Sequence, residues 1–270
     1  MSPTHPDASA LRPVSARSAL LGLLMSAEVP TLSARELVAG GRLVGFSETT
    51  VRVALSRMVA ADDLVRTADG RYQLSERLSH RQRRQEAAIH VQTASWDGDW
   101  DMVVVTATGR SAADRASLRA TLTELRLAEL REGVWVRPAN LDLEWSDDLA
   151  GLCERLTMRP TTDPAEFAGR LWDLAGWADR ARELLAATDT DDPVLRFTAC
   201  ATSVRHLLED PALPDELLPA DWPGPALRKA HLDYKDWLID TRQRGELSAT
   251  GSGSEQQVEA HIGVEHHRDE

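Results

Sequence analysis

Apolar residues recur every three or four positions through residues 46–63, FSETTVRVALSRMVAADD, and this spacing is typical of one face of a helix. Ser47 stands before the run, where its hydroxyl can accept a free backbone N–H of the first turn. Phe46 and Val51 occupy the two positions of a hydrophobic staple. The pattern therefore predicts a capped helix that begins at Glu48. Its apolar face consists of Val51, Ala54, Leu55, Met58 and Val59.

The opposite face of this helix combines small side chains with arginines. It carries Thr49, Val53, Ser56 and Ala60, with Arg52 and Arg57 at its edges. Small side chains allow a helix to lie deep in the major groove of DNA. Arginine can bond phosphates or the O6 and N7 atoms of guanine. We therefore expect this face to bind DNA.

Two shorter helices are predicted upstream. Residues 16–26, ARSALLGLLMS, form a compact apolar helix. Ser33 and Glu36 have the spacing of a capping box, which starts a second helix. We expect this second helix to end around Gly40 and Gly41, which would supply a turn.

Downstream, LVRTADGRYQL alternates around Asp69-Gly70, which is a two-residue hairpin signal. Helix, helix, turn, helix and hairpin is the order of a winged helix-turn-helix, here over residues 15–78. A three-helix domain with a hairpin and no DNA function is the alternative. The residues expected to contact DNA are Arg17, Ser47, Thr49, Thr50, Arg52, Val53, Ser56, Arg57, Arg66 and Arg71. Arg17 and the two hairpin arginines would hold phosphates, although solvated hairpin charges are an equally common interpretation.

Residues 79–95 follow as a connecting helix, opened by a capping box of Ser79 and Gln82. Arg81, Arg83 and Arg84 form a small basic run in this helix. Such a run is usually a solvated face, and a secondary phosphate contact is the alternative.

A middle domain is predicted over residues 96–162. MVVVTA is a β-branched run typical of a buried strand. Ser111 and Asp114 cap a long helix that we expect to reach Gly133, and VWV then starts another strand. Strand, helix and strand at this scale favour a ferredoxin-like α+β domain, whose second half is weakly patterned.

The chain becomes helical over residues 163–244. We expect helices at 165–187, 193–208 and 227–242. The proline-rich stretch 210–225 cannot be regular helix, and we expect an extended clasp anchored by its leucines and by Trp222. Residues 1–14 are predicted to be a flexible lead-in, and the polar tail 245–270 to be disordered. Metal binding by the tail residues His261, His266 and His267 is a minor alternative.

Charge is unevenly distributed. The formal net charge is −12, but residues 15–84 hold eleven Arg and seven Asp or Glu, which gives +4 and leaves −16 for the remainder. A basic head on an acidic body can bind phosphates through one face while the body repels unselective contact.

Other features limit the function classes. Cys153 and Cys200 lack metal-ligand or redox spacing, and we expect both to be buried rather than joined. We expect no membrane span, no secretory signal and a cytoplasmic location. No nucleophile elbow, phosphate loop or zinc spacing is present, so we expect no catalytic residue, metal site or cofactor.

Four stretches together resemble the PaaX-like family of bacterial transcriptional repressors, which control phenylacetic acid catabolism. They are GFSETTVRVALSRMVAADDLV, WDGDWDMVVV, GVWVRPANL and DPALPDELLPADWPG, spread over residues 15–240. The last, with its proline spacing, is the most distinctive. The resemblance implies a winged head, a ferredoxin-like middle domain and a helical C-terminal domain, in a homodimer that binds a palindromic operator in double-stranded DNA.

The resemblance also implies a small effector, phenylacetyl-coenzyme A in the namesake branch, that releases the repressor from DNA. An aryl-acyl-coenzyme A would need arginine and an aromatic surface, for which Trp135, Arg137 and Trp222 are the candidates. Each of them is also typical of a structural role, because tryptophan in a short apolar motif usually packs in a core.

Two other functions compete with the regulator. Small CRISPR-associated metal nucleases share the ferredoxin-like fold and place an aspartate beside the first strand, as Asp99 and Asp101 are placed here. Two carboxylates on a turn are more often solvated, and no further metal ligands gather by sequence. The second competitor is a winged-helix protein that binds DNA or a partner without a small ligand.

Overall fold

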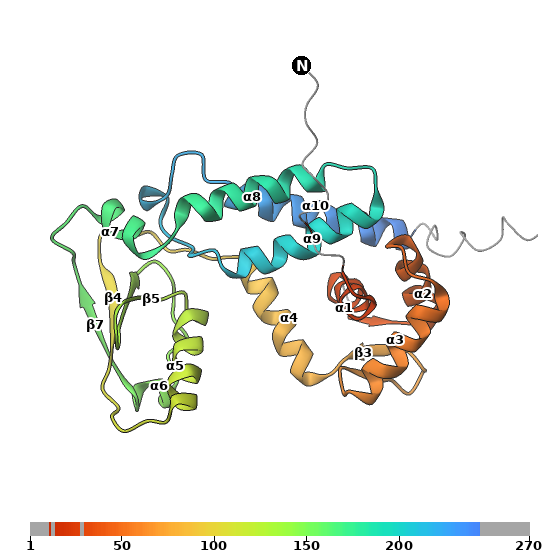
Figure 1. The fold of residues 1–270 in the computed structure, drawn as a ribbon, viewed down its shortest axis with the longest axis horizontal. Coiled ribbons are helices and arrows are strands. Elements are labelled where there is room, and N and C mark those ends of the chain that lie inside the picture. The colour runs from red at the N-terminus through yellow and green to blue at the C-terminus, as the bar shows by residue number, and fades with distance from the viewer. Residues whose placement is uncertain (1–10, 12–13, 28–29, 244–270) are drawn as a thin grey trace, which may run out of the picture.

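The computed structural model describes residues 11, 14–27 and 30–243. The predicted tail, with its three histidines, and all but two residues of the predicted lead-in lie outside the described residues. The described chain is an α+β fold with two small antiparallel sheets. Figure 1 shows the two sheet-containing parts at opposite ends of a bar of long helices.

The element bounds are as follows. The helices are α1 (Ala16–Ser26), α2 (Ala34–Leu43), α3 (Glu48–Ala60), α4 (Glu76–Ile89), α5 (Ala112–Glu124), α6 (Asp147–Ala150), α7 (Pro164–Leu171), α8 (Leu174–Thr188), α9 (Pro193–Leu208) and α10 (Gly224–Gln243). The strands are β1 (Thr31–Leu32), β2 (Leu64–Arg66), β3 (Tyr72–Leu74), β4 (Trp100–Val105), β5 (Ala128–Arg131), β6 (Val134–Pro138) and β7 (Cys153–Met158).

The N-terminal part packs α1, α2 and α3 around one core that includes Leu20, Leu24, Leu37 and Val51. The helix predicted from the 46–63 pattern is confirmed with its start at Glu48. The first helix and the capping box of the second are confirmed as well.

The prediction that the second helix ends at Gly40-Gly41 is wrong. Both glycines are buried inside α2, which continues to Leu43. A Cβ on Gly41 would lie 2.4 Å from Cγ2 of Val51 in α3. The glycine therefore permits a close approach of two helices, and the turn is made instead by Gly45, whose φ is +87°.

The hairpin is confirmed, but with a longer connection than the two-residue signal predicts. Its loop covers residues 67–71, where Gly70 adopts a φ of +77°. The short strand β1, which the sequence pattern does not predict, pairs with β3 and makes a three-stranded sheet in the order β1-β3-β2.

The connecting helix α4 begins three residues before and ends six residues before the predicted bounds 79–95, and the capping box of Ser79 and Gln82 is wrong. Its N-cap is Ser75, and the Ser79 hydroxyl donates to the Ser75 carbonyl within the first turn. In Figure 1, α4 runs from the β3 sheet up to α9.

The middle part has the element order β4-α5-β5-β6-α6-β7, with strands arranged β5-β6-β4-β7 and every neighbouring pair antiparallel. The prediction of one helix from Ser111 to Gly133 is wrong, because α5 ends at Glu124. The chain then turns at Arg126, whose φ is +61°, and forms β5, which the sequence analysis missed.

Both faces of this sheet are covered. On one face Val103, Trp135 and Cys153 pack with leucines of α5. On the other, Trp100 and Val136 pack with α7 and with the leucines of the proline-rich clasp. The sheet is therefore fixed to the rest of the molecule through the second face.

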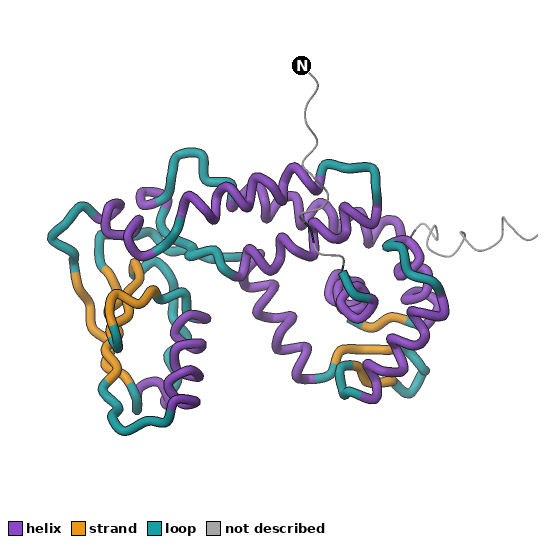
Figure 2. The backbone as a smooth tube through the Cα atoms, in the orientation of Figure 1, coloured by secondary structure: helices purple, strands orange, loops and turns teal. Residues whose placement is uncertain are grey.

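The helical part confirms 193–208 as α9, but the predicted helix 165–187 is two helices. α7 ends at Leu171, and Asp173 then caps α8 by accepting from the Gly176 N–H. The clasp is confirmed as largely irregular, with only a short 3-10 turn at Asp215–Leu217 (Figure 2). α10 starts at Gly224, earlier than predicted, because a proline is tolerated in a first helical turn.

Cys153 and Cys200 are both buried and free, as expected. Over the described ranges, each helix is too short or too polar to cross a bilayer.

Candidate nucleic-acid interface

α3 separates its two faces sharply. Val51, Leu55 and Met58 are 2 % exposed or less, whereas Arg52, Ser56 and Arg57 face solvent together with Thr49 and Thr50. Val53 is 45 % exposed, although it is apolar. The outward face is thus low in profile and edged with arginine, as the sequence analysis expects of a helix that enters a groove.

The start of α3 is held by local hydrogen bonds. Ser47 Oγ accepts from the Thr50 N–H over 3.2 Å and lies 2.8 Å from Thr50 Oγ1. Glu48 bonds Arg52 and Arg42, each over 2.8 Å, and the hydrogen bond from Arg52 lowers the pKa of this carboxyl. Arg57, by contrast, has no carboxylate partner among the described residues.

A groove of about 290 Å³ separates α3 from the hairpin. Arg52 and Ser56 line it from the helix, and Arg66 and Tyr72 line it from the strands. The Arg66 guanidinium lies over the Tyr72 ring, 5.6 Å from its centre. The structure therefore brings three of the predicted DNA residues together, and it adds Tyr72, which the sequence analysis did not single out.

Arg71 and Arg17 are bound within the N-terminal part. Arg71 donates to the Thr31 carbonyl over 2.9 Å and lies 3.4 Å from Glu36. Arg17 pairs with Asp63, whose side chain is 3 % exposed. Both arginines hold elements together, and a phosphate contact by either one stays a prediction.

The basic run of α4 is divided. Arg81 and Arg83 are exposed, while Arg84 pairs with Glu124 at the end of α5 over 2.8 Å. This ion pair links the connecting helix to the middle part.

The three candidate ligand residues do not meet at one cavity. Trp135 is buried against α5 with Arg119 over its ring. Trp222 is half-buried and stacks on Trp177, with ring centres 4.4 Å apart. Arg137 is wholly buried.

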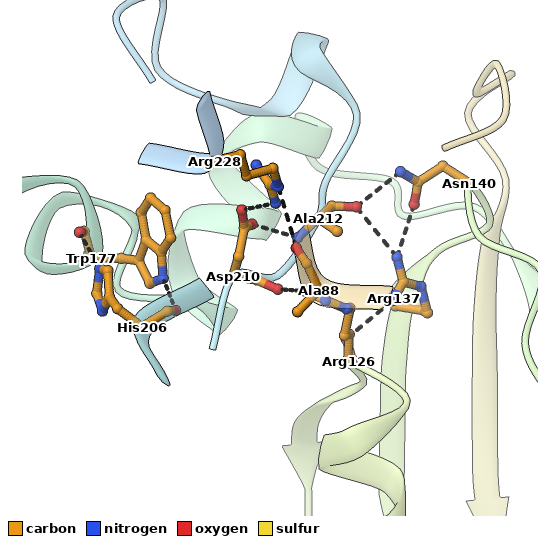
Figure 3. Close-up of polar contacts among 9 residues, drawn as sticks. All are labelled: Ala88, Arg126, Arg137, Asn140, Trp177, His206, Asp210, Ala212 and Arg228. Atoms are coloured by element: carbon orange, nitrogen blue, oxygen red, sulfur yellow. Dashed lines mark hydrogen bonds and ion pairs between the residues drawn. The ribbon is translucent and has the colours of Figure 1, made fainter. Parts of the chain in front are cut away.

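Arg137 occupies a junction between the middle part and the clasp (Figure 3). It donates to the carbonyls of Pro138 and Leu125 and to the side-chain oxygen of Asn140. Asn140 in turn donates to the Ala212 carbonyl over 3.0 Å. Burial, reinforced by a neighbouring arginine, lowers the pKa of Arg137 to about 9. In this conformation Arg137 joins two segments and is closed to a ligand.

Asp99 and Asp101, the carboxylates of the nuclease alternative, are paired with arginines in or directly after the edge strand β7. Asp101 is buried and accepts from Arg155 over 2.9 Å, and Asp99 pairs with Arg159. Among the described residues no group of three or more His, Cys, Asp or Glu could hold a metal ion. This geometry gives the nuclease no support.

Three segments of the chain match models of known protein families. Residues 12–78 match "PaaX-like protein", residues 93–159 "PaaX protein central Cas2-like domain" and residues 172–244 "PaaX-like protein C-terminal domain".

A solved structure, described as uncharacterized protein Rv0674 from Mycobacterium tuberculosis, is similar over nearly its whole length. It shares 47% identity, with 86% of this chain and 99% of that chain covered, at a TM-score of 0.76. No curated protein matches this chain significantly.

Proposed function

The chain belongs to the PaaX-like family, a family of regulators of phenylacetate catabolism, and from this premise we propose that it is a DNA-binding transcriptional repressor. It acts as a homodimer on a palindromic operator of a catabolic operon. A small effector of the aryl-acyl-coenzyme A type releases it from DNA.

The proposal includes a division into three domains. Residues 15–78 form a winged helix-turn-helix, residues 96–162 a ferredoxin-like domain and residues 163–244 a helical domain, with residues 79–95 as the connection. The sheet β1-β3-β2 beside α3 supports the first assignment. The β-α-β-β-α-β order with antiparallel neighbours supports the second.

The observation that carries the proposal is the outward face of α3. A helix that exposes Val53 and two arginines, next to a hairpin that offers Arg66 across a groove, fits a major groove flanked by phosphates. Arg52, Ser56 and Arg57 read base edges, and Arg66 holds the backbone.

A dimer is proposed because two N-terminal heads bind one DNA duplex more tightly than a single head does. One head makes few contacts, whereas two heads spaced a helical turn or a multiple apart dock together on one duplex. An effector that changes the spacing or tilt of the heads then removes most of the affinity, provided that it binds the two states with different free energies.

The test is to sequence the genomic DNA fragments that the purified protein selects. We expect enrichment of a two-fold symmetric sequence upstream of catabolic genes. Uniform recovery of fragments, without a shared sequence, would contradict the proposal.

A further inference from the structure

A cavity of about 140 Å³ lies where four helices of distant sequence meet. α1 of the N-terminal part forms one wall, α4 another, and α9 and α10 close it. In Figure 1, α4 runs from the N-terminal part up to α9 of the helical bar. The cavity therefore touches both the part that carries α3 and the part that would have to move relative to it.

The lining of the cavity is mostly apolar. Met25 of α1, Ile89 of α4 and Phe197 and Val204 of α9 contribute to its lining. An apolar cavity of roughly 150 Å³ in another protein holds a benzene molecule. The space is thus sufficient for one ring-sized apolar group.

Two polar atoms in this lining have no hydrogen-bond partner among the described residues. They are the Tyr234 hydroxyl and His231 Nδ1, both from α10. A buried polar group without a partner costs free energy, so native proteins rarely leave one without a ligand or water to satisfy it. Burial lowers the pKa of His231 to about 4, so the ring is neutral at pH 7. The pair thus offers one donor and one neutral imidazole nitrogen.

The mouth of the cavity is basic. Arg81 of α4 and Arg205 of α9 are exposed at its edge, and neither has a carboxylate partner among the described residues. Arg17 and Lys235 also line it, against the single carboxylate of Glu86. A carboxylate or phosphate at the mouth would meet these guanidinium groups, which bind planar and tetrahedral anions well.

We propose that this cavity is the effector site, and that it takes an organic anion whose ring-sized apolar group enters the interior while its carboxylate or phosphate groups bind Arg81 and Arg205. The binding part of this proposal stands on the cavity alone. Its consequence for DNA rests on the proposed function.

A direct path connects the cavity to the DNA-binding helix. Arg17 lines the cavity and donates to Asp63, which follows the C-terminus of α3. An anion that draws Arg17 towards the mouth weakens this ion pair and shifts α1 relative to α3. Occupancy also sets the distance between α1 and α9. The two states of the head thereby acquire different affinities for the ligand, as any allosteric effect requires.

The test compares a double variant with a matched single one in the full chain. Arg81→Gln with Arg205→Gln removes both mouth arginines, whereas Arg83→Gln removes an exposed arginine of α4 that does not line the cavity. Calorimetric titrations use phenylacetate, phenylacetyl-coenzyme A and coenzyme A as probes. If phenylacetate binds, the group that the mouth arginines recognise is a carboxylate. If only the thioester binds, that group is the phosphates of coenzyme A.

We expect the double variant to bind the active probe about tenfold more weakly or worse, and Arg83→Gln to bind it as the original chain does. Tyr234→Phe should also weaken binding, with an unfolding temperature that is unchanged or raised, because it removes an unpartnered hydroxyl. Equal affinity in the double variant, or binding of none of the three probes to the original chain, would overturn the proposal.

These outcomes separate the site from the regulator function. A chain that binds the probe through its mouth arginines but selects no DNA sequence keeps the site and loses the regulator. A chain that selects DNA but binds no probe keeps the DNA function and loses the site.

Discussion

Arg17 donates from Nε to Oδ2 of Asp63 over 2.6 Å, and so ties the first helix to the turn that follows α3. Arg77 of α4 bonds the other carboxylate oxygen. The carboxylate is nearly inaccessible to solvent, so its charge is compensated by two guanidinium groups from two different helices. One aspartate beyond the end of α3 therefore joins α1 and α4.

This arrangement predicts a specific loss of stability in acid. The hydrogen bond from Arg17 is the largest of the effects that lower the pKa of Asp63 in the folded chain. A lowered folded-state pKa gives stability that is fully present above the unfolded value of about 3.9 and is lost as pH falls through the folded-state pKa. We expect the unfolding temperature to decrease when the pH is lowered below about 4, and to decrease less in Asp63→Asn. The measurement is thermal unfolding from pH 7 to pH 2, and parallel curves for the two chains would contradict the prediction.

Arg52→Ala should weaken DNA binding without affecting the fold. The side chain is 62% exposed, and its only ion pair within the described part of the chain is with Glu48, which keeps Arg42 as a partner. A good base contact contributes about 1–3 kcal/mol, so we expect at least about tenfold weaker binding to the selected sequence. Fluorescence anisotropy with a labelled duplex measures this change.

The matched control for this variant is Arg180→Ala. Arg180 is an arginine of α8 paired with Glu183, away from α3. Its loss should leave DNA affinity unchanged. A normal affinity of the Arg52 variant would remove Arg52 from the interface, and an equal loss in both variants would indicate a general charge effect.

Gly41→Ala should destabilise the N-terminal part by about 1–3 kcal/mol, because the new methyl group would overlap Val51 across the α2–α3 contact. Val51→Ala in the same chain should recover part of this loss, which a double-mutant cycle of unfolding free energies measures. Gly169→Ala is the control, since nothing lies within 4 Å of that position in α7, and we expect it to be neutral or slightly stabilising. An additive cycle would contradict the proposed contact.

The sequence predicted those elements whose signals are local. Ser47 and the Ser33–Glu36 box lie next to the helices they cap, so α3 and the start of α2 follow from neighbouring residues. The same local reasoning gives the wrong role to Gly41. This glycine makes room for Val51 at the contact between α2 and α3, and it does not form a turn.

Other features depend on pairings that no local pattern reveals. β5 lies inside the stretch that local capping signals predict as helix up to Gly133, yet its Ala128 and Glu129 pair with β6. The cavity was missed for the same reason. Tyr234 carries no signal in the sequence and Arg81 stands out only as part of a basic run. The packing of α4 and of α10 against α9 is what brings the two residues to one space.

Arg137→Lys should cost about 2–3 kcal/mol of stability. An ammonium group keeps the charge but cannot donate at once to Leu125, Pro138 and Asn140, so buried acceptors lose their partners. Arg131→Lys, on the exposed end of β5, is the control and should change little. Urea unfolding followed by tryptophan fluorescence measures both, and equal midpoints would show that the fork geometry of Arg137 is not needed.

Trp222→Ala separates a structural tryptophan from a ligand contact. The Trp177 ring is stacked between those of Trp222 and His206, each centre 4.4 Å away, and Trp177 also donates to the His206 carbonyl. Removing Trp222 exposes one face of this stack, so we expect a loss of about 2–3 kcal/mol in stability. Trp222 lies outside the lining of the cavity between α1 and α10, so the affinity for phenylacetyl-coenzyme A should not change. Thermal unfolding and calorimetry on the same preparation distinguish the two roles. A variant that melts normally but no longer binds the thioester would move the effector site from that cavity to the Trp177 stack.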